Sequence, residues 1–180
     1  MTRPSSMEDD EDASGAITPG SKRWWGPLLW SLFHTLAEHS DRKDVIQVWL
    51  NLFKLTVDVL PCPNCRRHLL DYLKAHVFLK PMNVAKTKGI QFKEVIRRDI
   101  WALHTDINLR LEKPNVSLED LATKYNQTRA DALASANSIA EQLKEAWSPL
   151  LMKQILPGIY NRWFATLRLL TALLAMGPTP

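Results

Sequence analysis

Cys62 and Cys65 are the only two cysteines in the chain, and they lie in the segment LPCPNCRRHLL. Such a pair, with His68 three residues further on, can bind a metal, form a redox-active disulfide or be two structural thiols. A structural zinc ion takes four Cys or His ligands in a tetrahedral arrangement. Cys62, Cys65 and His68 would supply three, and His34 or His104 would have to supply the fourth. No second compact ligand pair follows at the spacing of a zinc finger, so the zinc site is incomplete.

A redox-active disulfide fits the surroundings of the two cysteines better. Pro63 directly follows Cys62 and predicts that a helix begins there. At the N-terminus of a helix, free N–H groups and the helix dipole stabilise a thiolate, and Arg66 and Arg67 add positive charge. One nucleophilic and one resolving cysteine are what dithiol exchange requires. Two buried structural thiols are the weaker interpretation, because a proline-flanked pair at a helix start is badly placed for packing.

The segments that must position this pair have the apolar period of helices. No segment alternates at period two, which argues against a thioredoxin-type fold, where a CxxC follows a strand. The chain also lacks the GxGxxG of a Rossmann turn. We therefore predict an all-α four-helix unit, followed by a stop at Pro114. The apolar positions of the first helix are Leu28, Leu29, Leu32, Phe33 and Leu36, and those of the second are Val45, Val48, Trp49, Leu52, Phe53, Thr56 and Val59. The third helix runs from Pro63 through Tyr72 to about Phe78, and a basic loop from Lys80 to Lys88 follows it. The apolar positions of the fourth helix are Phe92, Val95, Ile96, Ile100, Leu103, Ile107 and Leu111.

The two ends of the chain differ in character from this unit. Residues 1–22 are acidic and poor in large apolar side chains, which predicts a disordered tail. Residues 115–180 predict additional helices, the first opened by a capping box of Ser117 with Asp120 and ending near Gln127. A second helix carries an apolar stripe of Leu133, Ala136, Ala140, Leu143 and Trp147. A third is strongly apolar and lies in the segment ILPGIYNRWFATLRLLTALLAM.

The last apolar segment is interrupted by Pro157-Gly158, and its uninterrupted part after Arg168 is shorter than the roughly 20 residues that cross a bilayer. We therefore expect a buried or partner-facing helix rather than one on a membrane surface. The N-terminus lacks the basic start and apolar run of a signal peptide, which predicts an intracellular protein in a reducing compartment.

The length of 180 residues suits one ordinary domain, and 46% hydrophobic residues predict that most of the chain folds. Two cysteines are too few for a disulfide scaffold. The formal charge is +4, but the first 22 residues carry two basic and five acidic groups, which leaves +7 on the remainder. This balance favours an anionic partner or ligand without identifying it, and no motif indicates nucleic acid.

Two further groups of residues suggest a cofactor. Trp30 and His34 lie at i and i+4, on one face of the first predicted helix. His104 and Asn108 have the same spacing on the fourth helix, with Trp101 one turn earlier. A single histidine on an apolar face is more often a core residue than a ligand-binding one. Together, two faces with aromatic rings and histidines beside a CxxC indicate a slot for a planar heteroaromatic cofactor.

The three motifs resemble those of the Erv/ALR family of FAD-linked sulfhydryl oxidases. The family shows W-x-x-x-H, C-x-x-C-x-x-H and W-x-x-H-N-x-V-N-x-x-L-x-K-P elements. In this chain they are WSLFH, CPNCRRH and WALHTDINLRLEKP, in the same order, over roughly residues 24–114. The WGPxxW opening and small size are similar to members from large DNA viruses.

The resemblance implies an FAD-binding oxidase domain at 23–114, between the tail at 1–22 and the helical extension at 115–180, about which it is silent. It implies that Cys65 lies next to the flavin, that Cys62 exchanges with a substrate dithiol, and that reduced flavin passes electrons to oxygen to give hydrogen peroxide. Partners would be protein dithiols or a thiol carrier, and a second copy of the chain in a homodimer. The implied FAD-binding residues are Trp30, His34, His68, Trp101, His104, Asn108 and Lys113, and no metal is expected.

This sequence departs from the family pattern in three ways. Thr105 stands where the family has Asn, and Pro27 where it often has Arg. The additional shuttle cysteine pair of many members is absent, so Cys62 must meet the partner's thiols directly or through a separate carrier. The alternative function is a helical assembly or binding protein with a structural or zinc-binding CxxC.

Overall fold

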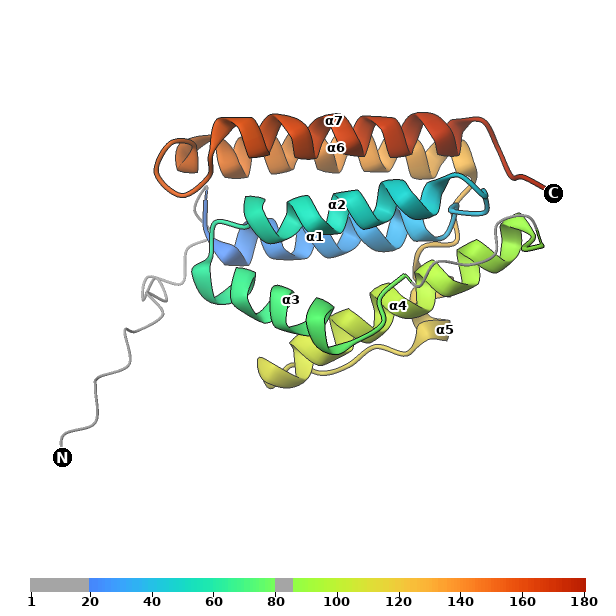
Figure 1. Ribbon diagram of the computed structural model, residues 1–180, viewed down its shortest axis with the longest axis horizontal. Helices are drawn as coiled ribbons and strands as arrows, with labels where there is room; N and C mark the ends of the chain where they lie inside the picture. The colour runs from blue at the N-terminus through green and yellow to red at the C-terminus, as the bar shows by residue number, and fades with distance from the viewer. Residues whose placement is uncertain (1–19, 80–85) are drawn as a thin grey trace.

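The computed structural model describes residues 20–79 and 86–180, and within these ranges the chain is all-α, as predicted (Figure 1). All but the end of the predicted acidic tail and most of the predicted basic loop lie outside the described residues. A single isolated bridge joins Leu151 and Ile155 in the loop before the last helix. The helices are α1 (Lys22–Ala37), α2 (Val45–Val59), α3 (Pro63–Ala75), α4 (Gly89–Arg110), α5 (Leu118–Lys124), α6 (Arg129–Trp147), the 3-10 turn η1 (Ser148–Leu150) and α7 (Pro157–Ala175).

Two helices end three residues earlier than the apolar pattern predicts. α3 stops at Ala75, because His76 is extended and the chain turns back towards α4. Phe78 still packs edge-on against Phe53, with ring centroids 4.6 Å apart, but from a non-helical segment. The predicted end at Phe78 was therefore wrong because apolar contact does not require a helix. α5 ends at Lys124 instead of Gln127, although its predicted cap is present, with Ser117 accepting a hydrogen bond from the backbone N–H of Asp120.

The helices form three layers, which are stacked from top to bottom in Figure 1. α6 and α7 lie together in the outer layer and cover α1 and α2, respectively. On the opposite side, α4 packs against α1 and α3 packs against α2, with the short α5 beside α4. α1 and α2 are therefore sandwiched between the C-terminal helices and the helices that carry the cysteine pair and the second histidine motif.

Tryptophan side chains fill the space between the outer and middle layers. Trp147 of α6 and Trp163 of α7 are fully buried and meet edge to face, with ring centroids 5.2 Å apart. Trp147 also contacts Trp25 of α1. The indole N–H of Trp163 donates to the hydroxyl of Thr56 in α2 at 2.9 Å. The apolar residues of α6 and α7 thus pack within the same chain. That residues 115–180 form a unit separable from 23–114 stays a prediction.

Arg129, at the start of α6, links the outer and middle layers at the end away from Trp147. Its guanidinium donates to the backbone carbonyls of His39 and Leu174, each at 3.0 Å. The same group makes two hydrogen bonds to the carboxylate of Asp41, at 2.9 and 2.7 Å. The start of α6 is thereby linked to the end of α1 and to the end of α7. Among the described residues, no helix is long and apolar enough to cross a membrane.

Replacing Thr56 tests the link between α2 and α7. Thr56→Val keeps the shape but leaves the buried indole N–H of Trp163 without an acceptor, so we expect the free energy of unfolding to fall by about 1–3 kcal/mol. Thr56→Ser keeps the hydroxyl and is the matched control, and we expect its free energy of unfolding to fall by less than that of Thr56→Val. Chemical denaturation measures both. Equal stability of the valine variant and the wild type would show that this hydrogen bond does not hold the layers together.

Candidate functional site

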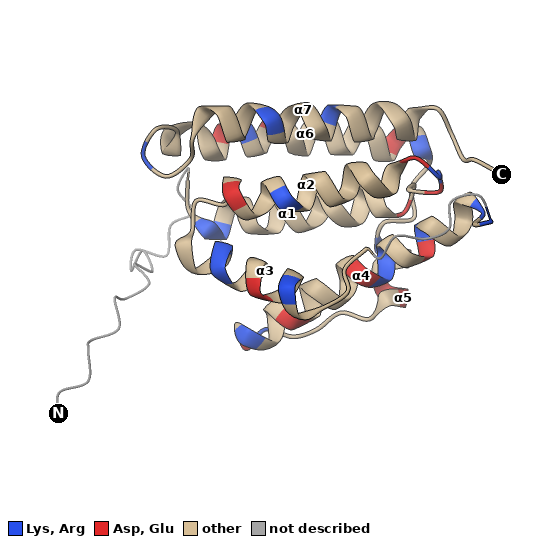
Figure 2. Cartoon of the chain, in the orientation of Figure 1, with Lys and Arg blue, Asp and Glu red and all other residues tan. Residues whose placement is uncertain are grey.

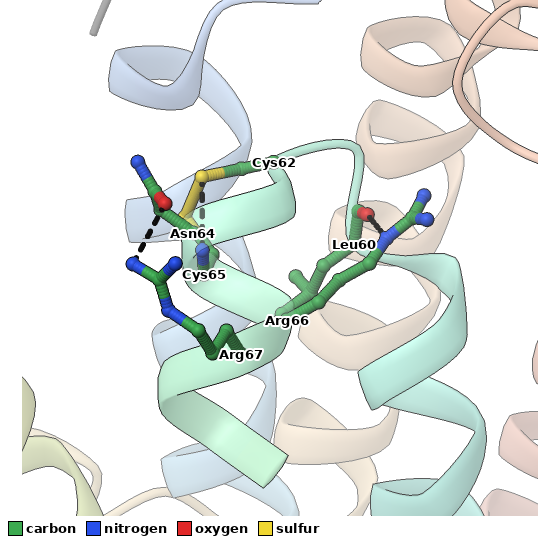
Figure 3. Close-up of a disulfide and its surroundings, with 6 residues drawn as sticks. All are labelled: Leu60, Cys62, Asn64, Cys65, Arg66 and Arg67. Atoms are coloured by element: carbon green, nitrogen blue, oxygen red, sulfur yellow. Dashed lines mark hydrogen bonds between the residues drawn. A yellow bond between two sulfur atoms is a disulfide. The ribbon is translucent and has the colours of Figure 1, made fainter. Parts of the chain in front are cut away.

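The two cysteines form a disulfide at the N-terminus of α3 (Figure 3). Cys62 is the N-cap of the helix, and its sulfur accepts a hydrogen bond from the backbone N–H of Cys65 at 3.1 Å. Pro63 occupies the first helical position, where a missing N–H costs nothing. Both cysteines are half-buried and pack against the apolar core. After reduction, the same N–H and the helix dipole would stabilise a thiolate on Cys62.

The two arginines after the pair have different surroundings. Arg67 is exposed and donates to the side-chain oxygen of Asn64 at 3.0 Å. Arg66 reaches away from the sulfur atoms, towards Leu60 (Figure 3). Its guanidinium donates to the backbone carbonyls of Leu60, at the end of α2, and of Gln154, in the loop before α7. Arg66 therefore ties α3 to two other segments, in addition to placing a positive charge near the cysteine pair as the sequence suggested.

Three of the predicted cofactor-binding residues come together between α1 and α4. The rings of Trp30 and His104 stack with centroids 4.1 Å apart and planes 8° from parallel. Nε2 of His34 and Nδ1 of His104 lie 2.9 Å apart and share a hydrogen bond. The i, i+4 spacing within α1 places Trp30 and His34 on the face that meets α4. These three rings, with the ring of Tyr125 described below, are termed the ring cluster.

The two histidines of the ring cluster are neutral near pH 7. Burial, with smaller contributions from His104 and Lys124, lowers the pKa of His34 from 6.5 to about 3. Burial, then the charges of Lys124 and Lys113, lowers the pKa of His104 from 6.5 to about 4. Because each ring carries one proton, one nitrogen of the shared hydrogen bond donates and the other accepts. Two lysine side chains therefore lie close enough to the cluster to act on it.

Tyr125, which the sequence reasoning missed, completes the cluster. Its buried ring lies 5.6 Å from that of His34, with the planes 25° apart, and its hydroxyl donates to the hydroxyl of Ser31 at 3.4 Å. The ammonium of Lys124 lies 5.4 Å from the centroid of the same ring. Tyr125 directly follows α5 and lies four positions after Leu121, which is also buried. That spacing was a signal for one buried face, but not for contact with His34.

The other predicted residues lie outside the ring cluster. The indole N–H of Trp101 donates to the carbonyl of Val116 at 2.8 Å. The side chain of Asn108 donates to the carbonyl of Pro114 at 3.4 Å, and its backbone carbonyl accepts from the N–H of Lys113 at 2.8 Å. These contacts shape the chain that leaves α4 and leads to α5, so Trp101 and Asn108 position the segment that carries Tyr125.

His68 is half-buried on α3 and, among the described residues, makes no hydrogen bond or ring contact with the cluster. Lys113 is exposed after the end of α4. In the described part of the chain, no group of three or more His, Cys, Asp or Glu side chains is arranged to hold a metal ion. The structure thus places a disulfide at one helix start and a cluster of neutral rings with nearby lysines between α1, α4 and the residue after α5.

Comparison with known proteins gives two matches. The model of the Erv1 / Alr family matches residues 27–128, a range that contains all three motifs and Tyr125. A protein of Invertebrate iridescent virus 3 whose name describes an FAD-linked sulfhydryl oxidase is 25% identical over 130 residues, which cover 71% of this chain and 80% of that protein. No solved structure matches the chain.

Acid should destabilise the ring cluster in a defined range of pH. In the unfolded chain the histidines take up protons near pH 6.5, whereas in the folded chain His34 and His104 resist protonation until about pH 3 and about pH 4. The unfolded state therefore binds more protons below pH 6.5, and stability present above that pH is lost as the pH falls towards 4. His104→Phe keeps a ring against Trp30 and removes one titrating group.

We expect the free energy of unfolding of His104→Phe to depend less steeply on pH than that of the wild type between pH 6.5 and 4. Denaturant titrations at several pH values measure the two slopes. Carboxylates titrate in both proteins, so only the difference between the slopes is informative. Identical slopes would mean that His104 takes up its proton equally well in the folded chain.

Proposed function

The chain belongs to the Erv1 / Alr family, and from this premise we propose that it is an FAD-linked sulfhydryl oxidase that introduces disulfides into protein substrates. The observation that carries the proposal is the Cys62–Cys65 disulfide at the N-terminus of α3, in a chain that also builds the ring cluster. The name of the iridescent-virus relative supports the same activity. A viral origin, suggested by the WGPxxW opening, is part of the proposal.

The residues of the ring cluster fit FAD. Neutral, flat rings stack well against a planar heteroaromatic group, and Trp30 and His104 are only partly buried, so they retain exposed surface. Lys113 and Lys124 are exposed and act electrostatically on His104, which suits the negative charge of a pyrophosphate. We propose that the ring cluster (Trp30, His34, His104 and Tyr125) and the two lysines, Lys113 and Lys124, hold the cofactor, while Trp101, His68 and Asn108 support it. When bound, FAD accepts two electrons from a dithiol and returns them to oxygen as hydrogen peroxide.

The disulfide exchange follows from the position of Cys62. A substrate thiolate attacks the sulfur of Cys62, the Cys62–Cys65 bond breaks, and Cys65 leaves as a thiolate. A second substrate thiolate then attacks the substrate sulfur of this mixed disulfide, and Cys62 leaves as a thiolate that the N–H of Cys65 stabilises. The substrate has lost two electrons and two protons and gained a disulfide. The cysteine pair holds the two electrons and must be reoxidised before the next turnover.

The assembly state is also part of the proposal. The resemblance predicts a homodimer. In this chain α6 covers one face of α1 and α7 covers one face of α2, so a second copy has no access to these two faces. A dimer would therefore have to use other surfaces.

Since no further cysteine is present, substrate thiols or a separate thiol carrier must reach Cys62 directly. Nucleic acid and membrane are not expected among its partners.

Single replacements of the cysteines test the exchange step. Cys62→Ser removes the sulfur that substrate attacks, and Cys65→Ser removes the partner that must leave, so we expect each variant to lose oxidase activity on a reduced protein. Oxygen consumption with reduced substrate is the measurement, and wild-type protein with intact FAD is the reference. Normal turnover by either variant would mean that the pair does not carry the electrons.

Replacing a ring tests the cofactor site. His104→Ala removes the ring that stacks on Trp30, so we expect weaker FAD retention and a lower melting temperature that excess FAD restores. His76→Ala removes an exposed histidine after α3 and serves as the control, with FAD retention unchanged. Absorbance of the purified proteins reports bound flavin. A wild-type protein that stays colourless even with added FAD would instead support the alternative of a helical assembly protein.

A further inference from the structure

The loop between η1 and α7, residues 151–156, is held in one conformation by backbone hydrogen bonds of its own. The backbone N–H of Met152 donates to the carbonyl of Ile155 at 2.9 Å, and the carbonyl of Leu150 accepts from Lys153, Gln154 and Ile155. Met152 has a positive φ of 68°, which a side chain with a Cβ rarely adopts. The loop belongs to the C-terminal region, beyond the residues that the family model matches.

The loop carries exposed apolar side chains. Met152 is 79% exposed, more than any other large apolar side chain in the described ranges, and Leu156 is 69% exposed. Ile155, between them, is buried and anchors the loop to the core. A backbone in a sparsely populated conformation that presents a large apolar side chain to solvent marks this loop as a candidate contact segment.

Arg66 joins this loop to the redox helix. Its backbone N–H donates to the carbonyl of Cys62 at 3.0 Å, and its guanidinium donates to the carbonyl of Gln154 in the loop. The loop therefore lies within the span of one arginine side chain from the residue that follows Cys65. A protein that exchanges thiols at Cys62 has to cover the surrounding surface, and specific interfaces cover roughly 800 Å² on each partner. Such a footprint extends from the disulfide to the loop.

The charges at this end indicate what kind of protein fits. Lys and Arg residues stand at the starts of α1 and α3 and in the loop before α7, all at the same end of the molecule (Figure 2). The exposed cations at this end are Lys22, Arg23, Arg67 and Lys153, and they outnumber the exposed carboxylates, Asp58 on the last turn of α2 and Glu145 on the last turn of α6. Cations beside an exposed methionine and leucine favour a partner with acidic and apolar side chains near its thiols.

We propose that residues 151–156 form, together with the start of α3, the docking surface for protein dithiol substrates that carry acidic and apolar side chains. This inference rests on the proposed oxidase function and assigns to the C-terminal region the recognition of its substrate. The contact made by Met152 and Leu156 accelerates exchange of protein thiols with the Cys62–Cys65 disulfide and has no effect on a small dithiol, which is too small to reach both.

The experiment measures exchange without FAD turnover or oxygen. Wild-type protein and the double variant Met152→Asn, Leu156→Ser are mixed under nitrogen with reduced α-lactalbumin, an acidic protein, or with dithiothreitol, and loss of the Cys62–Cys65 disulfide is followed by thiol labelling. Asn tolerates the positive φ at position 152, and Ser is a better N-cap than Leu for α7. Both substitutions should therefore preserve the fold. Met176→Asn, 69% exposed at the far end of α7, is the matched control.

We expect the double variant to react about tenfold more slowly with reduced α-lactalbumin, the loss that two partly buried apolar contacts would cause, and at the wild-type rate with dithiothreitol. Met176→Asn should react with both at the wild-type rate. Lys153→Glu should slow α-lactalbumin more than reduced lysozyme, a basic protein. An unchanged rate for the double variant with α-lactalbumin, or equal losses with both reagents, would overturn the proposal. A failure of aerobic thiol oxidation would overturn only the oxidase function, because the exchange step needs neither flavin nor oxygen.

Discussion

Helix α1 is buried on two sides, and this burial keeps both histidines of the ring cluster neutral and holds the cluster's rings in place. One side of this helix meets α6 and the other meets α4, and every residue from Leu32 to Ala37 is buried. His34 therefore stands in the interior, where a charged imidazole would be costly, and it is kept neutral beside a second neutral histidine. A helix that exposed one face to water would hold His34 in solvent and would leave Trp30 and His104 without a fixed relative position.

The C-terminal helices α6 and α7 are thus linked to the ring cluster although they contribute no side chain to it. Trp147 and Trp163 fill the space above α1 and α2, and the hydrogen bond from Trp163 to Thr56 sets the position of α7 along α2. At the other end, Arg129 links the start of α6 to His39 and Asp41, in the segment that follows α1. The catalytic half and the C-terminal half share one core in this chain, so a mutation in α6 or α7 can alter the site by moving α1.

The sequence was sufficient to predict most of the helices and the disulfide between Cys62 and Cys65, because both are local. Apolar spacing depends on 3.6 residues per turn, and the proline after Cys62 fixes where α3 begins. The helix ends were harder, since Phe78 packs against Phe53 from a non-helical segment and not from a helix. The contact of Tyr125 with His34 joins residues far apart in the chain, and no period records it. The same holds for Trp101, whose indole bonds to Val116 instead of facing the cluster.

The hydrogen bond between Cys62 and the N–H of Cys65 has a consequence for the helix as well as for the sulfur. Stabilisation between two groups is reciprocal: if the end of the helix lowers the free energy of a thiolate, the thiolate lowers the free energy of the helix by the same amount. Reduction places a negative charge at the positive end of α3, where charge and dipole attract. The first turn of α3 is thus closed by the disulfide while the pair is oxidised and held by the attraction between thiolate and dipole once the pair is reduced, so each catalytic cycle exchanges a covalent for an electrostatic restraint at this helix terminus.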